Sequence, residues 1–218
     1  PVYGLGMIKM DANSNIIWSY GENVHDGFDV DSDGKVYSLL QTPTHGKDVP
    51  EVDYARAPAM IDSIAILSAD GVEEKRIDLF QAFSHSKYDQ MLYSVGNSMR
   101  YAYTNSIMVL NKDMAAHFPM FKEGDLLVAI ANMDTIAVIR PSTALVVWAN
   151  HGLWRRPFDA RFTENGTISL YDSQGYYDGN PVQQGRVLRF NPATQGVEWF
   201  YNQTDRLEKS DTMSGMQQ

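Results

Sequence analysis

An imidazole followed at once by a carboxylate is the pair in this sequence best suited to catalysis. The pair is His25 and Asp26. Histidine exchanges its proton near neutral pH, so His25 could act as a nucleophile or as a general acid and base. The alternative is structural: a histidine at the start of a strand that bonds Asp26 or a backbone carbonyl. A nucleophile usually comes with an orienting base and an anion clamp, so a clamp has to be sought elsewhere in the chain.

Two adjacent arginines are the best candidates for that clamp. Arg155 and Arg156 follow Trp154 in a stretch with loop character. Paired guanidinium groups suit bidentate binding of sulfate, phosphate or carboxylate. They could equally be surface arginines that pair with some of the surplus acidic residues. We therefore treat Arg155 and Arg156 as candidate substrate-binding residues.

An acidic run with alternating spacing gives a candidate metal site. Asp29, Asp31 and Asp33 precede a glycine in the D-x-D-x-D-G spacing of a calcium loop, which presents oxygen atoms at alternate residues. The twelfth position of the loop is Leu40 rather than the glutamate that completes an EF-hand. The competing interpretation is a Ser-Asp-Gly hairpin turn with solvated carboxylates. Calcium aside, the sequence predicts no cofactor.

Composition excludes several classes of function. The chain has 218 residues, of which 44% are hydrophobic, and a formal net charge of −9. This charge argues against binding nucleic acid, whose phosphates need a positive surface, and against docking on anionic lipid. The absence of cysteine excludes disulfides, thiolate catalysis and cysteine-based zinc sites. No stretch is apolar over the length that a membrane span needs.

The elements that must position these residues are short strands joined by turns, and one hairpin recurs. Residues 134–148 contain two apolar strands around a Pro-Ser-Thr turn and end in Trp148. The same frame ends at Trp18 and Trp199, and a degenerate copy has Arg76 in the tryptophan position. The copies lie 58, 72 and 51 residues apart (18 to 76, 76 to 148 and 148 to 199). Hairpins repeated at roughly 40–50 residues, with insertions, are typical of β-propeller blades.

These repeats predict an all-β fold, a partial β-propeller domain over residues 1–218 with about three to four blades. A polar, proline-rich insertion is expected at about 41–60, and a helix-like insertion at about 80–100. The repeat frame is cut within a blade at both ends. Because an open arc leaves strand edges exposed, we expect a longer chain or another chain to supply the missing blades.

Several segments resemble the arylsulfotransferase (arylsulfate sulfotransferase) propeller family. They are residues 121–128 (FKEGDLLV), 132–138 (NMDTIAV), 147–149, 158–162 (FDARF), 186–194, 198–199 and 214–217. The resemblance runs over about residues 100–218 and is thinner over 1–80. It implies a six-bladed ring that moves a sulfuryl group between phenols without a nucleotide donor, through a sulfated histidine at the central channel. It also implies a periplasmic or secreted protein whose leader is not in this sequence, with a cytoplasmic location as the alternative.

The chain departs from the family pattern at three positions where chemistry is expected. Where the family has histidine, arginine and histidine, this sequence has Tyr103, Ala131 and Phe158. His25 and Asp26 keep a family-like His-Asp pair. They stand one repeat unit earlier, at the place equivalent to Phe158 and Asp159. Tyr103 and Asn105 could line the channel and bond a phenolic ligand, or Tyr103 could pack between blades.

Two functions follow as hypotheses. The first is an arylsulfotransferase-like propeller that transfers or binds the sulfuryl group of small aryl sulfates and phenols at the channel mouth. If active, it would be an aryl-sulfate:phenol sulfotransferase that uses His25, with Arg155 and Arg156 offsetting the charge of the sulfuryl group. The alternative is a non-catalytic binding or assembly module that has lost the catalytic histidines and arginine. A third, separate reading is a propeller steadied by calcium at Asp29, Asp31 and Asp33.

Overall fold

Strands dominate the chain, and within each sheet they pair antiparallel in the order in which they follow one another in the sequence. The computed structural model describes residues 4, 6–44, 59–94, 102–173 and 185–202. Within these residues the strands are β1 (Met7–Met10), β2 (Ile16–Tyr20), β3 (Val24–Val30), β4 (Val36–Thr44), β5 (Ala59–Leu67), β6 (Glu73–Asp78), β7 (Thr104–Val109), β8 (Leu126–Ile130), β9 (Thr135–Arg140), β10 (Leu145–His151), β11 (Pro157–Phe162), β12 (Ile168–Asp172), β13 (Arg186–Asn191) and β14 (Gly196–Asn202).

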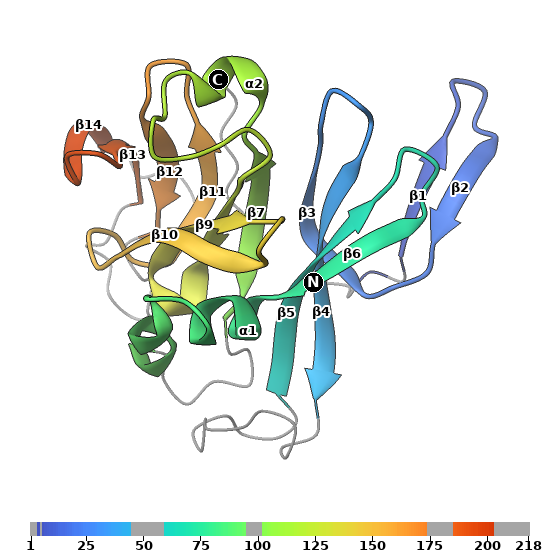
Figure 1. Cartoon of the computed structure of the whole chain (residues 1–218), viewed down its shortest axis with the longest axis horizontal. Coiled ribbons are helices and arrows are strands. Elements are labelled where there is room, and N and C mark those ends of the chain that lie inside the picture. Colours follow the sequence, from blue (N-terminus) through green and yellow to red (C-terminus); the bar gives the residue numbers. More distant parts are fainter. Residues whose placement is uncertain (1–3, 5, 45–58, 95–101, 174–184, 203–218) are drawn as a thin grey trace.

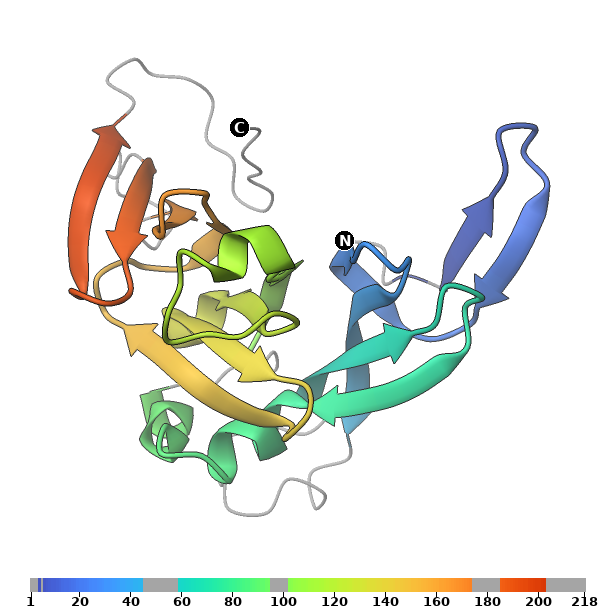
Figure 2. The same cartoon turned by 45° about the horizontal axis from the view of Figure 1, so that its top comes forward.

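The strands form three four-stranded sheets and one two-stranded pair (Figure 1). We call β3–β4–β5–β6 the first blade, β7–β8–β9–β10 the second and β11–β12–β13–β14 the third, and β1 pairs with β2 alone. Figure 2 shows that the sheets follow one another along an arc, from β1 and β2 in blue at one end to β13 and β14 in red at the other. The prediction of an all-β, partial β-propeller with three to four blades is confirmed.

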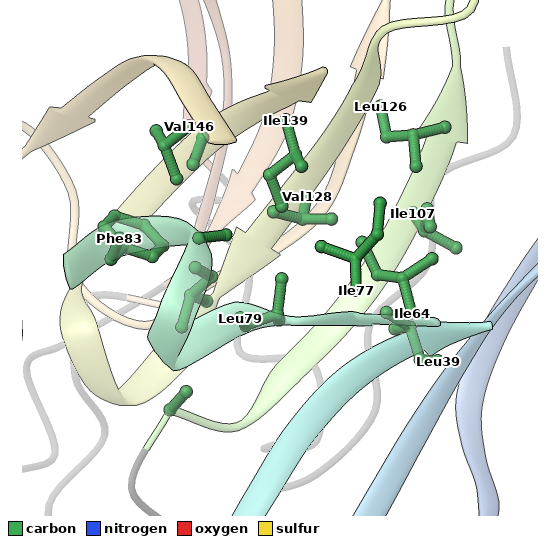
Figure 3. Close-up of a cluster of buried hydrophobic side chains, with 14 of the residues drawn as sticks. Leu39, Ile64, Ile77, Leu79, Phe83, Ile107, Leu126, Val128, Ile139 and Val146 are labelled. Carbon is green, nitrogen blue, oxygen red and sulfur yellow. The ribbon is translucent and has the colours of Figure 1, made fainter. Parts of the chain in front are cut away.

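Both faces of the second blade are apolar, and this is what stacks the blades. Along β8, residues 126, 128 and 130 pack in a cluster shared with the first blade, whereas residues 127 and 129 pack in a cluster shared with the third. Successive side chains of a strand point to opposite faces, so a continuous apolar run fills both. We call these two clusters the first seam and the second seam. Figure 3 shows the first seam, in which Leu39 and Ile64 of the first blade meet Val128 and Ile139 of the second.

Aromatic rings fill the second seam. Trp148 lies 5.8 Å from the ring of Phe121 and 6.1 Å from that of Phe190, centroid to centroid. Trp154 meets Phe190 edge to face at 5.2 Å. Rings of this size bury large apolar areas, and their tilted arrangement adds favourable contact energy. The second and third blades are therefore held together by shape-matched aromatic packing.

The repeated hairpin predicted from the sequence occupies the same place in every sheet. Trp18, Arg76, Trp148 and Trp199 all lie in the last strand of their sheet, in β2, β6, β10 and β14. Each of these hairpins shifts register at a bulge. The environments differ at the two ends of the arc: Trp18 donates its indole N–H to the carbonyl of Ala69 at 3.1 Å, and Trp199 lies under the guanidinium of Arg189 at 5.0 Å.

The two expected insertions are only partly within the described residues. Strand β4 continues to Thr44 and β5 begins at Ala59, so the ends of the predicted 41–60 insertion are strand, and residues 45–58 lie outside the described part. Over 80–100, helix α1 (Leu79–Ser84) and the 3₁₀ helix η1 (Asp89–Ser94) are present, and residues 95–100 lie outside.

The helices are short, and α1 and η1 pack at the first seam. Asp78 caps α1 by accepting a hydrogen bond from the backbone N–H of Gln81 at 3.0 Å. The buried face of α1, with Leu79 and Phe83, packs into the first seam. The remaining helical turns are α2 (Lys112–Ala115) and η2 (Ala131–Met133). Among the described residues, none of the helices is long and apolar enough to cross a membrane.

Truncating a side chain in the first seam should destabilise the protein by far more than truncating the same residue type at the surface. Leu126 is fully buried, so Leu126→Ala is expected to lower the free energy of unfolding by about 2–5 kcal/mol. Leu153 is 41% exposed, and Leu153→Ala should cost less than about 1 kcal/mol. Urea unfolding followed by tryptophan fluorescence measures both. Equal losses would mean that the seam is not the core.

Candidate functional site

The innermost strands of the three blades, β3, β7 and β11, lie side by side and run in the same direction. Asp29 on β3 accepts a hydrogen bond from the backbone N–H of Val109 on β7 at 2.7 Å. Ser106 on β7 accepts one from the N–H of Ala160 on β11 at 3.1 Å. The three strands belong to different sheets, so side chains rather than a backbone ladder join them. The first residues of these three strands therefore lie on the same side of the arc of blades, and we call this side the strand-start end.

Each of these strands is interrupted by a bulge at the strand-start end. The register shifts between Val24 and Phe28 in β3, between Thr104 and Ser106 in β7, and between Phe158 and Arg161 in β11. A residue at or beside each bulge has a left-handed backbone, with φ of 50° at Asp26, 55° at Tyr103 and 48° at Asp159. Bulges re-aim side chains and occur often beside functional sites. His25 and Asn105, both predicted from the sequence, lie in two of these bulges.

His25 is nearly enclosed and held by its neighbour. Its Nδ1 lies 3.0 Å from a carboxylate oxygen of Asp26, and its side chain is 7% exposed. In the neutral imidazole this bond places the proton on Nδ1 and leaves a lone pair on Nε2. Nε2 has no hydrogen-bond partner among the described residues and faces Asp62 Oδ1 at 4.0 Å. The imidazole thus has one oriented nitrogen and one open nitrogen.

Asp62 is the member of this site that sequence reasoning missed. Its side chain is fully buried on β5 and accepts hydrogen bonds from Gln41 Nε2 at 3.0 Å and from the backbone N–H of Thr104. Burial raises the pKa of the Asp62 carboxyl, although the charge of His25 and the two hydrogen bonds act against that rise. The available signal was a lone acid in the otherwise apolar segment 59–67. One carboxylate therefore joins β4, β5 and β7 across the first seam.

The three positions that depart from the family pattern meet in space. Tyr103, Ala131 and Phe158 form one small buried cluster, and Tyr171 packs against it. The rings of Tyr103 and Phe158 lie edge to face, 6.4 Å apart. Tyr103 comes from the start of the second blade and Phe158 from the start of the third, so Tyr103 packs between blades. Apolar packing occupies the place where three polar groups were expected.

Asn105 links this cluster to the arginine loop. Its Nδ2 donates to the carbonyl of Pro157 at 2.9 Å, while its Oδ1 is buried and has no partner among the described residues. Pro157 directly follows Arg156. Tyr103, Asn105 and the loop with Arg155 and Arg156 therefore lie together at the boundary of the second and third blades, whereas His25 lies at the boundary of the first and second.

The arginine loop is fixed through its backbone. The N–H of Arg155 donates to Asp172 at 2.9 Å, and the N–H of Arg156 donates to Asp134 at 2.7 Å. Arg156 has a left-handed φ of 47°. Arg155 is exposed and Arg156 half-buried, and neither guanidinium forms an ion pair with a residue that the structure describes. Two cations are thus presented without a carboxylate partner in the described part of the chain.

Two of the three aspartates of the predicted calcium loop, Asp29 and Asp31, accept hydrogen bonds through their carboxylates. Asp29 bonds the backbone of β7, as described above, and Asp31 accepts hydrogen bonds from the N–H groups of Asp33 and Lys35, each at 2.9 Å. Asp31 also accepts one from the Tyr37 hydroxyl at 2.9 Å. Over the described ranges, no group of three or more His, Cys, Asp or Glu side chains could hold a metal ion.

The electrostatics of the strand-start end divide at β7. On one side, His25 faces the carboxylates of Asp26 and Asp62. On the other side lie two arginines and an aromatic cluster. An imidazole between carboxylates repels a sulfate group, whereas the arginine side attracts one. Negative charge therefore lies beside His25, and the two arginines lie on the side of the aromatic cluster.

Comparison with known proteins identifies the family of this fold. The model of one protein family, described as "Arylsulfotransferase (ASST)", matches residues 71–216. No curated protein matches the sequence. Among solved structures, the Dos1 propeller is similar with a TM-score of 0.53 at 10% identity over 93% of this chain, and this chain spans 43% of that one. A protein of unknown function from Bacteroides caccae has a TM-score of 0.40 at 10% identity and is matched over 91% of this chain and 69% of its own.

Replacing Asp62 by asparagine should change how stability depends on pH. Because burial raises the pKa of Asp62 in the folded protein above its ordinary value of 3.8, the folded state holds this proton more tightly than the unfolded state. The contribution of Asp62 to stability is therefore fully present below pH 3.8 and is lost as the pH rises through the raised pKa. Asp62→Asn removes this loss.

Urea unfolding of the wild type and the variant at several pH values between about 3 and 7 measures the difference. The free energy of unfolding of the wild type, minus that of Asp62→Asn, should fall as the pH rises. A difference that rises with pH would mean that the carboxylate is stabilised as an anion and that its burial does not dominate.

Proposed function

This chain belongs to the arylsulfotransferase family, whose match covers 146 of its 218 residues, and from that premise we propose that it is a binding propeller which no longer transfers sulfuryl groups. The proposal rests on one observation. Tyr103, Ala131 and Phe158 fill with buried apolar packing the three positions where the family pattern has histidine, arginine and histidine. The scaffold of the site is kept, but its polar groups are not.

The size of the expected loss supports this choice. Removing a single group that stabilises developing charge typically lowers kcat by about 100-fold to 1,000-fold. Here three polar groups are replaced together, and the one remaining imidazole faces two carboxylates. Such a site stabilises negative charge poorly, so the barrier to moving a sulfuryl group rises by several kcal/mol relative to a fully polar site.

The ligand proposed for this propeller is a small aromatic anion or phenol. Arg155 and Arg156 supply unpaired positive charge at the start of β11, and the Oδ1 atom of Asn105 is an acceptor for a phenolic O–H group. The neighbouring rings of Tyr103 and Phe158 favour an aromatic body. The proposed binding site is at the strand-start end, where the family resemblance predicts the channel mouth. By analogy with the family, we propose that the protein acts outside the cytoplasm.

A second candidate function has one specific observation in its favour. The bond between His25 Nδ1 and Asp26 leaves Nε2 oriented and without a hydrogen-bond partner among the described residues, as a nucleophile would need. In that reaction Nε2 attacks the sulfur, the bond to the aryl oxygen breaks, and the phenolate leaves. A second phenol then takes the sulfuryl group from His25 and gives up its proton. This route would need Arg155 or Arg156 to reach across β7.

A turnover assay separates the two functions. The complete protein and its His25→Ala variant are incubated with a chromogenic aryl sulfate and a phenol acceptor. We expect no turnover above the rate of the variant, because the charge-stabilising groups are missing. Turnover that His25→Ala abolishes would establish the transferase instead, and turnover that survives the substitution would place catalysis at another residue.

Binding is measured in the same preparations. Calorimetric titration with the non-reacting phenol and with the aryl sulfate should give saturable binding. Replacing both Arg155 and Arg156 by glutamine should weaken aryl sulfate binding by about tenfold or more, because charge-assisted hydrogen bonds to the anion are lost. Arg161 is already paired with Asp159 at 2.8 Å, so Arg161→Gln serves as the matched control and should leave the affinity unchanged. Failure to bind either ligand would contradict the proposal.

A further inference from the structure

A polar groove crosses the first seam near the last residues of the inner strands β3 and β7, whereas His25 lies near their first residues. The groove has a volume of about 460 Å³, within the range of small-molecule sites. Its walls come from β4, β5 and β6 of the first blade and from β9, the segment before β8 and the β9–β10 turn of the second. Figure 2 shows the β9–β10 turn, in yellow, close to β6 in green. The groove lies where the inner strands end, so it is separate from the strand-start end.

The groove gathers positive charge in an acidic protein. Four cationic and three acidic residues line it, although the whole chain has a net charge of −9. They are Lys35, Lys75, Lys122, Arg140, Glu74, Glu123 and Asp125. One positive charge is therefore in excess at this place. Such a local reversal of sign concentrates anions.

Two of the cations are already neutralised within the groove. Arg140 donates through Nε and Nη2 to the two oxygens of Asp125, at 2.9 and 2.7 Å, and Asp125 is buried. Lys35 Nζ lies 2.5 Å from Glu74. A bidentate arginine–carboxylate pair of this kind is geometrically fixed, so the floor of the groove is rigid.

The other two cations are not compensated by these pairs. Lys75 Nζ donates to the carbonyl of Pro141, a neutral acceptor, and so keeps its full charge and two further N–H donors. Lys122 forms no ion pair with any residue in the described part of the chain. Glu123 also lines the groove and forms no ion pair within the described ranges, so two cations and one carboxylate remain and their sum is a single positive charge that attracts an anion.

Apolar surface lies beside these ammonium groups. Tyr37 and Ile66 come from the first blade and Pro141 from the second, and all three line the groove. Tyr37 and Ile66 are 7% and 6% exposed, so each offers only a small apolar surface to the groove, and the Tyr37 hydroxyl already donates to Asp31. A ligand that fits would have an acidic group for the lysines and a small apolar body for this surface.

We propose that this groove binds a small carboxylic acid with an apolar body, as a second site independent of the channel mouth. The excess of one positive charge selects a singly charged carboxylate over a dianion. The carboxylate accepts hydrogen bonds from the ammonium groups of Lys75 and Lys122, and the body packs on Tyr37, Ile66 and Pro141. Because the ligand contacts both blades, it links them across the first seam.

Benzoate is the probe for this site, and neutral benzamide is its matched control. Amide resonances of the full chain are followed by NMR during titration with each compound. We expect saturable shifts at Gly124 and Ser142, which line the groove, with benzamide at least about tenfold weaker because it lacks the charge. Lys75→Gln combined with Lys122→Gln should weaken benzoate by about tenfold. Lys87→Gln, which removes an exposed lysine next to Tyr88 in the α1–η1 region, should not change it.

Three results of the benzoate titration at the groove would overturn the proposal. They are the absence of saturable shifts at millimolar benzoate, equal affinity for benzamide, and affinity that survives the double lysine substitution. His25→Ala and the Arg155/Arg156 substitutions should leave benzoate binding at Gly124 unchanged. Shifts centred on Asn105 and Arg156 instead would assign benzoate to the channel mouth and contradict a second site.

Discussion

Burial of both faces of a sheet is the constraint on which the rest of this structure depends. The central strand β8 of the second blade is apolar at every position, and its side chains enter a cluster on each face, so the blade is packed between two neighbours. Stacking of this kind brings the innermost strands together while keeping them in separate sheets. Hydrogen bonds to polar side chains then connect these strands in place of a backbone ladder, as in the bond from the Val109 N–H to Asp29.

The division of the strand-start end into a side with His25 and a side with the arginines follows from the same geometry. Because β7 lies between β3 and β11, the imidazole and the arginines approach it from opposite sides. His25 is left with Asp26 and Asp62, and the arginines are left with an aromatic cluster. Replacing buried polar groups by well-packed apolar ones is often neutral or stabilising for a protein. The buried packing of Tyr103, Ala131 and Phe158 is an arrangement of this kind, and it is compatible with the proposed loss of transfer activity.

Much of the fold could be predicted from the sequence, because its signals are local. The two short apolar strands in residues 134–148 and the turn residues between them predict a hairpin. The recurrence of that hairpin along the chain predicts a propeller. The bond from His25 to Asp26 was also foreseeable, since the two residues are adjacent. The Asp62 network was not, because its partners Gln41 and Thr104 lie 21 and 42 residues away. The clustering of Tyr103, Ala131 and Phe158 likewise depends on the register of strands in two blades.

The most direct test of the central claim, that apolar packing has replaced the transfer chemistry, is the covalent state of His25. The complete protein is exposed to an excess of aryl sulfate without an acceptor phenol, and the reaction is quenched rapidly. The mass of the peptide that contains His25 is then measured by mass spectrometry. A peptide of unchanged mass at every time point is the expected result. A peptide heavier by one sulfuryl group, with the modification on His25, would contradict the claim.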